Sequence, residues 1–311
     1  MTRDPPRSDS INGLVGQRLG CQDASMQRGL LYTVAAASLA GIGGVVAADV
    51  FATVDPVIVA QYRSVIAAFV LVPVAYWRRA TTTGGRLPQL ALSGAVIAAL
   101  TVTFYWSIDR LGVGPGVTLQ FTASIPVLTW MRFVQGRPVP AKTWIAAAVA
   151  VTGTAAMLRA WDIESLDLIG LAAGTTSMLL YATYLVFTEH LGRTTPDLTI
   201  IAYGFAISAL IWVVAVPPSI IDAPARTWIQ IAWVGLMATA VPFLLLVMAL
   251  SRVDSGSVGV VATIEPVVAA SAAWIFLGQG LTLIQVFGGV LVIWSLVVVQ
   301  RTVAGTVTAP V

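Results

Sequence analysis

Ten apolar runs of near membrane length limit the possible folds of this chain more than any other feature. In lipid, every backbone N–H and C=O group must be satisfied within the protein, so only helices and closed barrels span a bilayer. A helix crosses the hydrocarbon core in about 20 apolar residues. We therefore predict an all-α membrane protein with ten transmembrane helices. The runs lie near residues 30–51, 57–76, 90–108, 114–134, 143–158, 168–188, 198–216, 228–250, 256–277 and 281–299.

The composition leaves little material for a soluble domain. Hydrophobic residues make up 58% of the chain and charged residues 10%, whereas soluble domains have about 25% charged residues. We expect residues 1–29 to form a disordered cytoplasmic tail and residues 300–311 a second one. The first tail does not resemble a signal peptide, because it lacks an apolar core of about 7–15 residues. Its Cys21 is the single cysteine, so an intrachain disulfide is excluded.

Lysine and arginine are distributed unevenly over the connecting segments. If the N-terminus is cytoplasmic, 13 of the 17 basic residues fall on the cytoplasmic side, and Arg110, Arg159 and Arg226 fall outside. Because basic residues accumulate in cytoplasmic loops, we predict a multi-pass protein of the cytoplasmic (inner) membrane with both termini cytoplasmic. Arg63 is the one basic residue left after these two groups, and it lies within an apolar run.

The second half of the chain repeats the first. Displacing the sequence by 142 residues aligns Asp55 with Asp197, and other identities follow along the chain. We therefore expect a first repeat at 30–158 and a second at 168–299, each with five helices. An odd number of spans gives the second repeat the opposite topology, and such inverted repeats place a site near the bilayer midplane. Further aligned pairs are Ala60 with Ala202, Ala67 with Ala209, Arg110 with Arg252, Gly114 with Gly256, and Gly136 with Gly278.

Several short motifs in the second half permit a family comparison. Residues 248–256 (MALSRVDSG), 264–270 (IEPVVAA), 277–279 (LGQ) and 288–289 (GG) resemble the EamA-type transporters of the drug/metabolite transporter superfamily. The resemblance implies a ten-helix secondary transporter of the inner membrane, often an exporter of amino acids or other small metabolites. Two positions depart from the family pattern: Gln279 replaces a frequent acid, and Ala123 occupies the first-half position that corresponds to Glu265.

Glu265 and Pro266 lie in the middle of an apolar run. A charged residue at that depth costs roughly 2.5–3.5 kcal/mol, and a proline removes one backbone donor. We predict a helix break at Pro266 and consider three roles for Glu265. In the first, it caps free backbone donors near the break and holds the two halves together. In the second it takes up and releases a proton, and in the third it contacts a substrate amine.

Arg63 is the second candidate for substrate binding or proton coupling. It lies about 6 residues from the outer end of its run, or about 9 Å deep at 1.5 Å per residue. It is placed to bind a substrate carboxylate or to pair with Glu265. The alternative is that its side chain reaches the outer interface, or pairs with Asp49 or Asp55.

Polar and aromatic side chains within the runs predict an internal surface, because polar groups in lipid must face protein or water. The alternative for each of them is an ordinary hydrogen bond between helices. We also predict a second helix break at Pro126. The predicted cavity-lining residues are Gln120, Thr122, Tyr105, Tyr181 and Tyr203.

No catalytic set can be assembled from this sequence. His190 is the single histidine, so a Ser-His-Asp triad or a histidine-based metal site has little to build on. The chain has no P-loop, which argues against ATP-driven transport. We predict no enzyme activity, no cofactor, no metal and no nucleic acid partner. The prediction is an exporter of a small metabolite that works by alternating access, with a passive facilitator or an importer as the alternatives and the oligomeric state left open.

Overall fold

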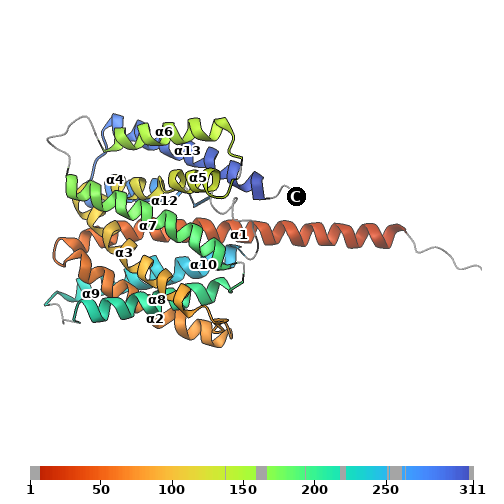
Figure 1. The fold of residues 1–311 in the computed structure, drawn as a ribbon, viewed down its shortest axis with the longest axis horizontal. Helices are drawn as coiled ribbons and strands as arrows, with labels where there is room; N and C mark the ends of the chain where they lie inside the picture. The colour runs from red at the N-terminus through yellow and green to blue at the C-terminus, as the bar shows by residue number, and fades with distance from the viewer. Residues whose placement is uncertain are drawn as a thin grey trace, which may run out of the picture.

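A computed structural model describes residues 8–136, 138–158, 167–192, 194–217, 222–250, 252, 261–262 and 264–307. Every regular element within these residues is a helix (Figure 1), as predicted for an all-α protein. The elements are α1 (Ser8–Phe51), α2 (Pro56–Trp77), α3 (Leu87–Leu111), α4 (Val113–Phe121), α5 (Ser124–Phe133), α6 (Ala141–Met157), α7 (Leu168–Gly192), α8 (Asp197–Ala215), α9 (Ala225–Gly235), the π-helix η1 (Leu236–Ala240), α10 (Val241–Leu250), α12 (Ile264–Leu277) and α13 (Leu283–Val307).

Six helices in the described part of the chain are long and apolar enough to cross a membrane. Two further apolar helices, Ile264–Leu277 and Leu283–Ser295, are shorter. The start of the predicted run 256–277 lies outside the described residues. A multi-pass membrane protein is confirmed, whereas the count of ten spans stays a prediction. The six long helices are Met26–Phe51, Pro56–Trp77, Leu87–Leu111, Leu168–Gly192, Asp197–Ala215 and Ala225–Ala249.

The first and last helices extend beyond the predicted runs. Helix α1 begins at Ser8, so residues 8–29 are helical where a disordered tail was expected. No proline lies between Ser8 and Phe51, so every backbone N–H in this stretch is able to continue the helical ladder. Helix α13 likewise continues to Val307. The first part of α1 projects from the bundle on the side where α13 ends (Figure 1).

The predicted run 114–134 is two helices, α4 and α5, rather than one. Pro126 has no N–H to donate to the carbonyl of Thr122, four residues earlier. The N–H of Ile125 donates to that carbonyl instead, at 2.9 Å, and the N–H of Ala123 donates to Gln120 O at 3.0 Å. These tighter bonds produce a turn between α4 and α5, one helical turn before Pro126.

A π-helical turn interrupts the run that forms α9 and α10. Pro242 is the second residue of α10 and cannot donate to the carbonyl of Ala238. The preceding N–H, that of Val241, bonds to Leu236 O, five residues back. The extra residue of the π turn therefore accommodates the proline without ending the helix.

Helices of the two halves pack side by side, as α2 and α8 show. Gln61, early in α2, donates its amide to Trp212 O, late in α8, at 3.2 Å. Thr199, early in α8, donates its hydroxyl to Ala80 O, just after α2, at 2.7 Å. The two helices are therefore antiparallel. Other cross-half contacts join α3 to α7, α6 to α13, and α1 to α9, η1 and α10.

Glycine allows α6 and α13 to approach until their backbones touch. A Cβ atom added to Gly153 would lie 2.7 Å from the carbonyl oxygen of Gly288, and one added to Gly288 would lie 2.5 Å from that of Gly153. Lipid gives helices no hydrophobic reason to associate, so small residues and close van der Waals contact hold such pairs together.

We predict that Gly288→Ala lowers the free energy of unfolding by about 1–3 kcal/mol, because the new methyl group overpacks the contact with α6. Gly280→Ala is the matched control, since nothing lies within 4 Å of a Cβ at that position. Thermal unfolding in detergent micelles measures both. Equal stability of the two variants would show that α6 and α13 are not in contact at Gly288.

Candidate functional site

Arg63 on α2 is the charge around which buried polar groups gather. Its Nε donates a hydrogen bond of 2.6 Å to Thr239 Oγ1 on η1. Its guanidinium carbon lies 5.4 Å from the centre of the Tyr105 ring on α3, and such a cation over an aromatic face is stabilised by the ring quadrupole. The side chain of Arg63 thus points into the bundle. Three helices from both halves of the chain meet at this one side chain.

The two carboxylates considered as alternative partners of Arg63 are engaged elsewhere. Asp55 caps α2 by accepting a bond of 2.7 Å from Val57 N. Asp49 accepts from Arg226 Nη2 at 3.0 Å and from Gln230 Nε2 at 2.7 Å. Neither contact involves Arg63.

Thr239 is able to accept from Arg63 because of the π turn. Its hydroxyl is fully buried and donates its own proton to Val234 O, five residues back, at 2.9 Å. The oxygen therefore keeps its lone pairs for the arginine N–H. Thr239 is not among the residues predicted from the sequence to form the site. The available signal was a threonine three residues before Pro242 in an otherwise apolar run.

Tyr105 provides the aromatic face against which the Arg63 guanidinium lies. It is 2% exposed. Its ring centre lies 5.1 Å from that of Phe51 on α1 and 6.0 Å from that of Phe104. This aromatic packing fixes the ring face that receives the Arg63 guanidinium.

Glu265 lies in the first turn of α12 and is half-buried. Helix α1 packs directly on its backbone, since a Cβ added to Gly41 would lie 2.9 Å from Glu265 O. The charges of Arg63 and Glu265 act on each other, yet no ion pair joins them among the described residues. Pro266 is buried beside Glu265. The predicted helix break there depends on residues 253–260 and 263, which lie outside the described part.

Gln120 and Thr122 fasten α4 to α7. Gln120 Nε2 donates to the buried Ser177 Oγ at 2.9 Å. Thr122 Oγ1 contacts Met178 Sδ at 3.1 Å and donates to Leu119 O at 2.6 Å. Gln120 thus makes a hydrogen bond between helices, which is the alternative considered for it, and the cavity-lining role of both residues stays a prediction.

Of the two tyrosines predicted on the second half, one lies near the charged residues and one does not. Tyr181 on α7 lies near Glu265, and its ring centre lies 6.4 Å from that of Phe121. Tyr203 donates its hydroxyl to Thr81 O in the α2–α3 connection, at 3.1 Å. The structure thus brings Arg63, Tyr105, Tyr181 and Glu265 together and places Tyr203 elsewhere.

Ion pairs hold two of the cross-half contacts at one end of the bundle. Asp49 joins α1 to α9 through Arg226, and Arg110 joins α3 to Asp167, just before α7, at 3.1 Å. The backbone N–H of Gly170 and then Arg110 hold the pKa of Asp167 below its usual value. Asp167 is therefore charged, and its pair with Arg110 is present, throughout the physiological pH range.

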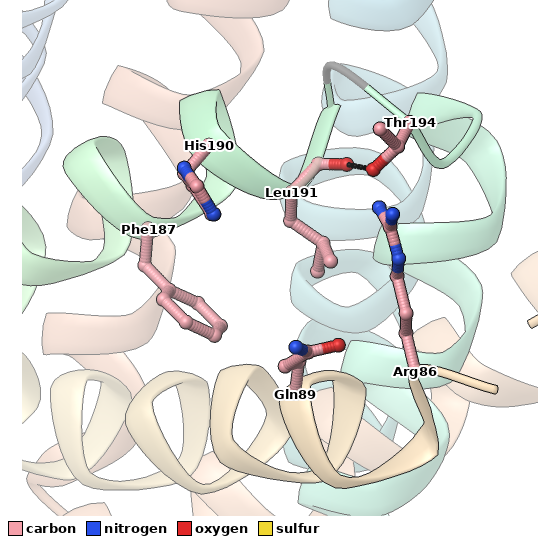
Figure 2. Close-up of a pocket in the computed structure, with 6 residues that line it drawn as sticks. All are labelled: Arg86, Gln89, Phe187, His190, Leu191 and Thr194. Atoms are coloured by element: carbon pink, nitrogen blue, oxygen red, sulfur yellow. Dashed lines mark hydrogen bonds between the residues drawn. The ribbon is translucent and has the colours of Figure 1, made fainter. Parts of the chain in front are cut away.

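The pocket found in this structure does not coincide with Arg63. It has a volume of about 410 Å³ and lies between the start of α3 and the end of α7 (Figure 2). Gln89 on its floor and Tyr105 are separated by about 24 Å along α3 at 1.5 Å per residue. The pocket is a separate feature from the Arg63 cluster. Its lining residues are Arg86, Gln89, Phe187, His190, Leu191 and Thr194.

Within the described part of the chain, no group of three or more His, Cys, Asp or Glu side chains is arranged to hold a metal ion.

The family model for EamA-like transporters matches the chain twice, over residues 27–159 and 168–301. The chain belongs to the EamA-like transporter family. The resemblance drawn from residues 248–289 is confirmed, and this EamA-like protein is a membrane transporter rather than an enzyme.

Individual relatives support the same assignment. The chain is 30% identical over 264 residues to the threonine/homoserine exporter RhtA of Escherichia coli (strain K12), which covers 82% of this chain and 85% of that protein. It is 25% identical over 218 residues to an uncharacterized transporter of Archaeoglobus fulgidus, covering 70% and 78% of the two chains. A crystal structure of a protein 13% identical in sequence superposes with a TM-score of 0.64 and covers 92% of this chain and 99% of its own. That last likeness concerns the fold alone.

We predict that Thr239→Val destabilises the protein, because it leaves the half-buried N–H of Arg63 without its acceptor. A hydrogen bond to a charged group contributes about 1.5–3 kcal/mol. Thr239→Ser keeps the hydroxyl and serves as the control. Chemical or thermal unfolding in detergent compares the two, and equal losses would exclude a role for the Arg63–Thr239 bond.

Proposed function

We propose that this EamA-like protein exports a small amino acid that binds between Arg63 and Glu265. The observation that carries this proposal is the placement of two opposite charges. Arg63 is held against Thr239 and Tyr105, while Glu265 lies half-buried in the first turn of α12 and forms no ion pair with Arg63 among the described residues. A zwitterion carries the complementary pair. Its carboxylate matches the guanidinium of Arg63, and its ammonium group matches the carboxylate of Glu265.

The surroundings of this charge pair favour a small substrate. The ring of Tyr105 lies beside Arg63, and the ring of Tyr181 lies near Glu265. Phe51 packs against the first ring and Phe121 against the second. Two related proteins from enteric bacteria are named threonine/homoserine exporters. We propose threonine or a similar hydroxylated amino acid as the first substrate to test.

Glu265 is the proposed coupling group. In this scheme the carboxylate holds the substrate ammonium group on one side of the membrane. A proton that enters from the other side neutralises Glu265 and releases the substrate. Proton and substrate therefore bind the same carboxylate in turn and move in opposite directions. The purely structural alternative, in which Glu265 only secures α12 against α1, is separated from this scheme by the transport assay below.

Alternating access is proposed through two inverted five-helix repeats, 30–158 and 168–299. Two matches of one family model support the division. The contact pattern also supports it, because a displacement of 142 residues converts the pair α3–α7 into the pair formed by α1 with α9, η1 and α10. Gly136 and Gly278, which the same displacement aligns, both have positive φ, 66° and 64°.

We propose that both termini face the cytoplasm and that the membrane is the inner membrane. The distribution of basic residues along the sequence supports this orientation. The side shared by the projecting part of α1 and the end of α13 (Figure 1) is consistent with it.

Reconstitution in liposomes tests the function. We expect an imposed pH gradient to drive threonine accumulation. Glu265→Gln abolishes that accumulation, while threonine exchange between equal pools continues with a higher KM, because the amide oxygen still accepts a hydrogen bond from the ammonium group but has lost the negative charge. Glutamine retains the size of the side chain but cannot carry the proton. If Glu265→Gln accumulates threonine normally, the coupling role is wrong. Flux without saturation or accumulation in the wild type would identify a passive facilitator.

Substrate binding is tested at Arg63. Arg63→Lys keeps a positive charge but loses the planar pair of donors that a carboxylate accepts. We expect the KM for threonine to rise about tenfold or more, as loss of one charge-assisted hydrogen bond implies. An unchanged KM in a folded Arg63→Lys protein would remove Arg63 from the substrate site.

Cysteine accessibility tests the topology. In a background with Cys21→Ser, a single cysteine at Thr82 or at Gly280 occupies a connecting segment, between α2 and α3 or between α12 and α13. We expect an impermeant maleimide to label Gly280→Cys from outside intact cells, and Thr82→Cys only after the membrane is opened. Labelling of both positions from the same side would refute the proposed arrangement of spans.

A further inference from the structure

The pocket between α3 and α7 contains the guanidinium of Arg86 and the imidazole of His190. Figure 2 shows Arg86 and His190 on opposite sides of it, with Gln89 on the floor. Neither the Arg86 nor the His190 side chain makes a hydrogen bond or ion pair in the described part of the structure. By contrast, the Thr194 hydroxyl donates to Leu191 O at 3.3 Å. None of the described residues that line the pocket is a carboxylate.

One side of the pocket wall is apolar. Phe187 and Leu191 line it from α7. On α3, Leu87 and Leu92 are both 53% exposed beside the polar residues of the pocket. In a membrane helix, exposed leucines of this kind face acyl chains. The pocket therefore places a guanidinium beside a lipid-facing surface, which is the pattern of an amphiphile site.

The level of the pocket in the membrane is set by aromatic residues. Tyr76 and Trp77 end α2 and are 72% and 78% exposed. Such residues concentrate where the hydrocarbon meets the headgroups. The short connection after Trp77 leads directly to Arg86, so the charged wall of the pocket lies at headgroup depth.

We propose that this pocket binds the phosphate headgroup of an anionic phospholipid. Arg86 holds the phosphate through its planar pair of donors, His190 adds a further donor, and one acyl chain lies along Phe187 and Leu92. An anionic lipid is favoured over a zwitterionic one because Arg86 supplies a positive charge and the described lining residues include no carboxylate to receive a choline or ethanolamine ammonium group. Basic pockets between membrane helices bind acidic headgroups in this way.

The site is distinct from the proposed transport site in position and chemistry. It lies about 24 Å along α3 from Tyr105. Its described lining residues include the positive charge of Arg86 but no acidic group of the kind that an amino acid requires. Binding there is therefore independent of whether Arg63 and Glu265 bind substrate.

Native mass spectrometry of the purified full-length protein tests the proposal. The protein is exchanged into detergent micelles that contain equal amounts of phosphatidylglycerol and phosphatidylcholine with identical acyl chains. We expect the wild type to retain phosphatidylglycerol in preference, and Arg86→Gln to reduce that preference by about fivefold, as loss of one basic residue at a headgroup implies. His190→Gln, a change at an exposed helix end, provides a second variant, for which we expect a reduction in the same direction.

Arg78→Gln is the matched control, because Arg78 is an exposed arginine at the end of α2 that does not line the pocket. We expect it to keep the preference of the wild type. Equal losses in Arg78→Gln and Arg86→Gln would show general surface attraction and overturn the site. Displacement of phosphatidylglycerol by millimolar inorganic phosphate would assign the pocket to a free anion and overturn the lipid. Displacement by threonine would assign it to substrate and overturn it equally.

Discussion

The site depends on keeping one arginine charged inside a bilayer. A guanidinium at that depth is costly unless protein groups replace the water it has lost. Here Thr239 supplies an acceptor and Tyr105 an aromatic face. Thr239 is available because the π turn directs its own proton to Val234 O, and the π turn exists because Pro242 cannot continue an α-helical ladder. A backbone irregularity caused by a proline in one half of the chain thus stabilises the charge contributed by the other half.

The two halves are held together mainly by close contact of small residues. Lipid surrounds apolar side chains as favourably as protein does, so the hydrophobic effect does not hold these helices together. Close van der Waals contact does so instead, at Gly153 against Gly288 and at Gly41 against the backbone of Glu265. The second of these contacts involves a residue of the candidate site. It fixes the position of the α12 backbone at Glu265, and therefore fixes where the carboxylate enters the bundle relative to Arg63.

The sequence predicts the helical class well, because hydropathy and the need to satisfy backbone groups in lipid admit few alternatives. It also predicts the break before Pro126, since a missing N–H has a defined partner four residues back. It predicts side-chain direction poorly. Gln120 and Tyr203 satisfy the same rule as Tyr105, that polar groups avoid lipid, but Gln120 bonds Ser177 and Tyr203 bonds a loop carbonyl. Thr239 was missed because its role depends on a π turn, which hydrophobic periodicity does not reveal.

The two ends of the α3–α7 contact differ in a way that suits a transporter. At one end Arg110 pairs with Asp167 across the helices, and at the other end Arg86 and His190 stand apart around a pocket. Arg110 and Asp167 are each partly exposed, 41% and 34% by side chain, and ion pairs of this kind contribute about 0–1 kcal/mol. Such a contact selects one arrangement of the helix ends but opposes their separation only weakly. By contrast, the half-buried Arg63 bonds to the fully buried Thr239 and lies over the buried Tyr105 ring, and these contacts are more costly to lose. Movement of the ends around a fixed centre therefore meets less resistance than movement of the centre itself, as alternating access requires.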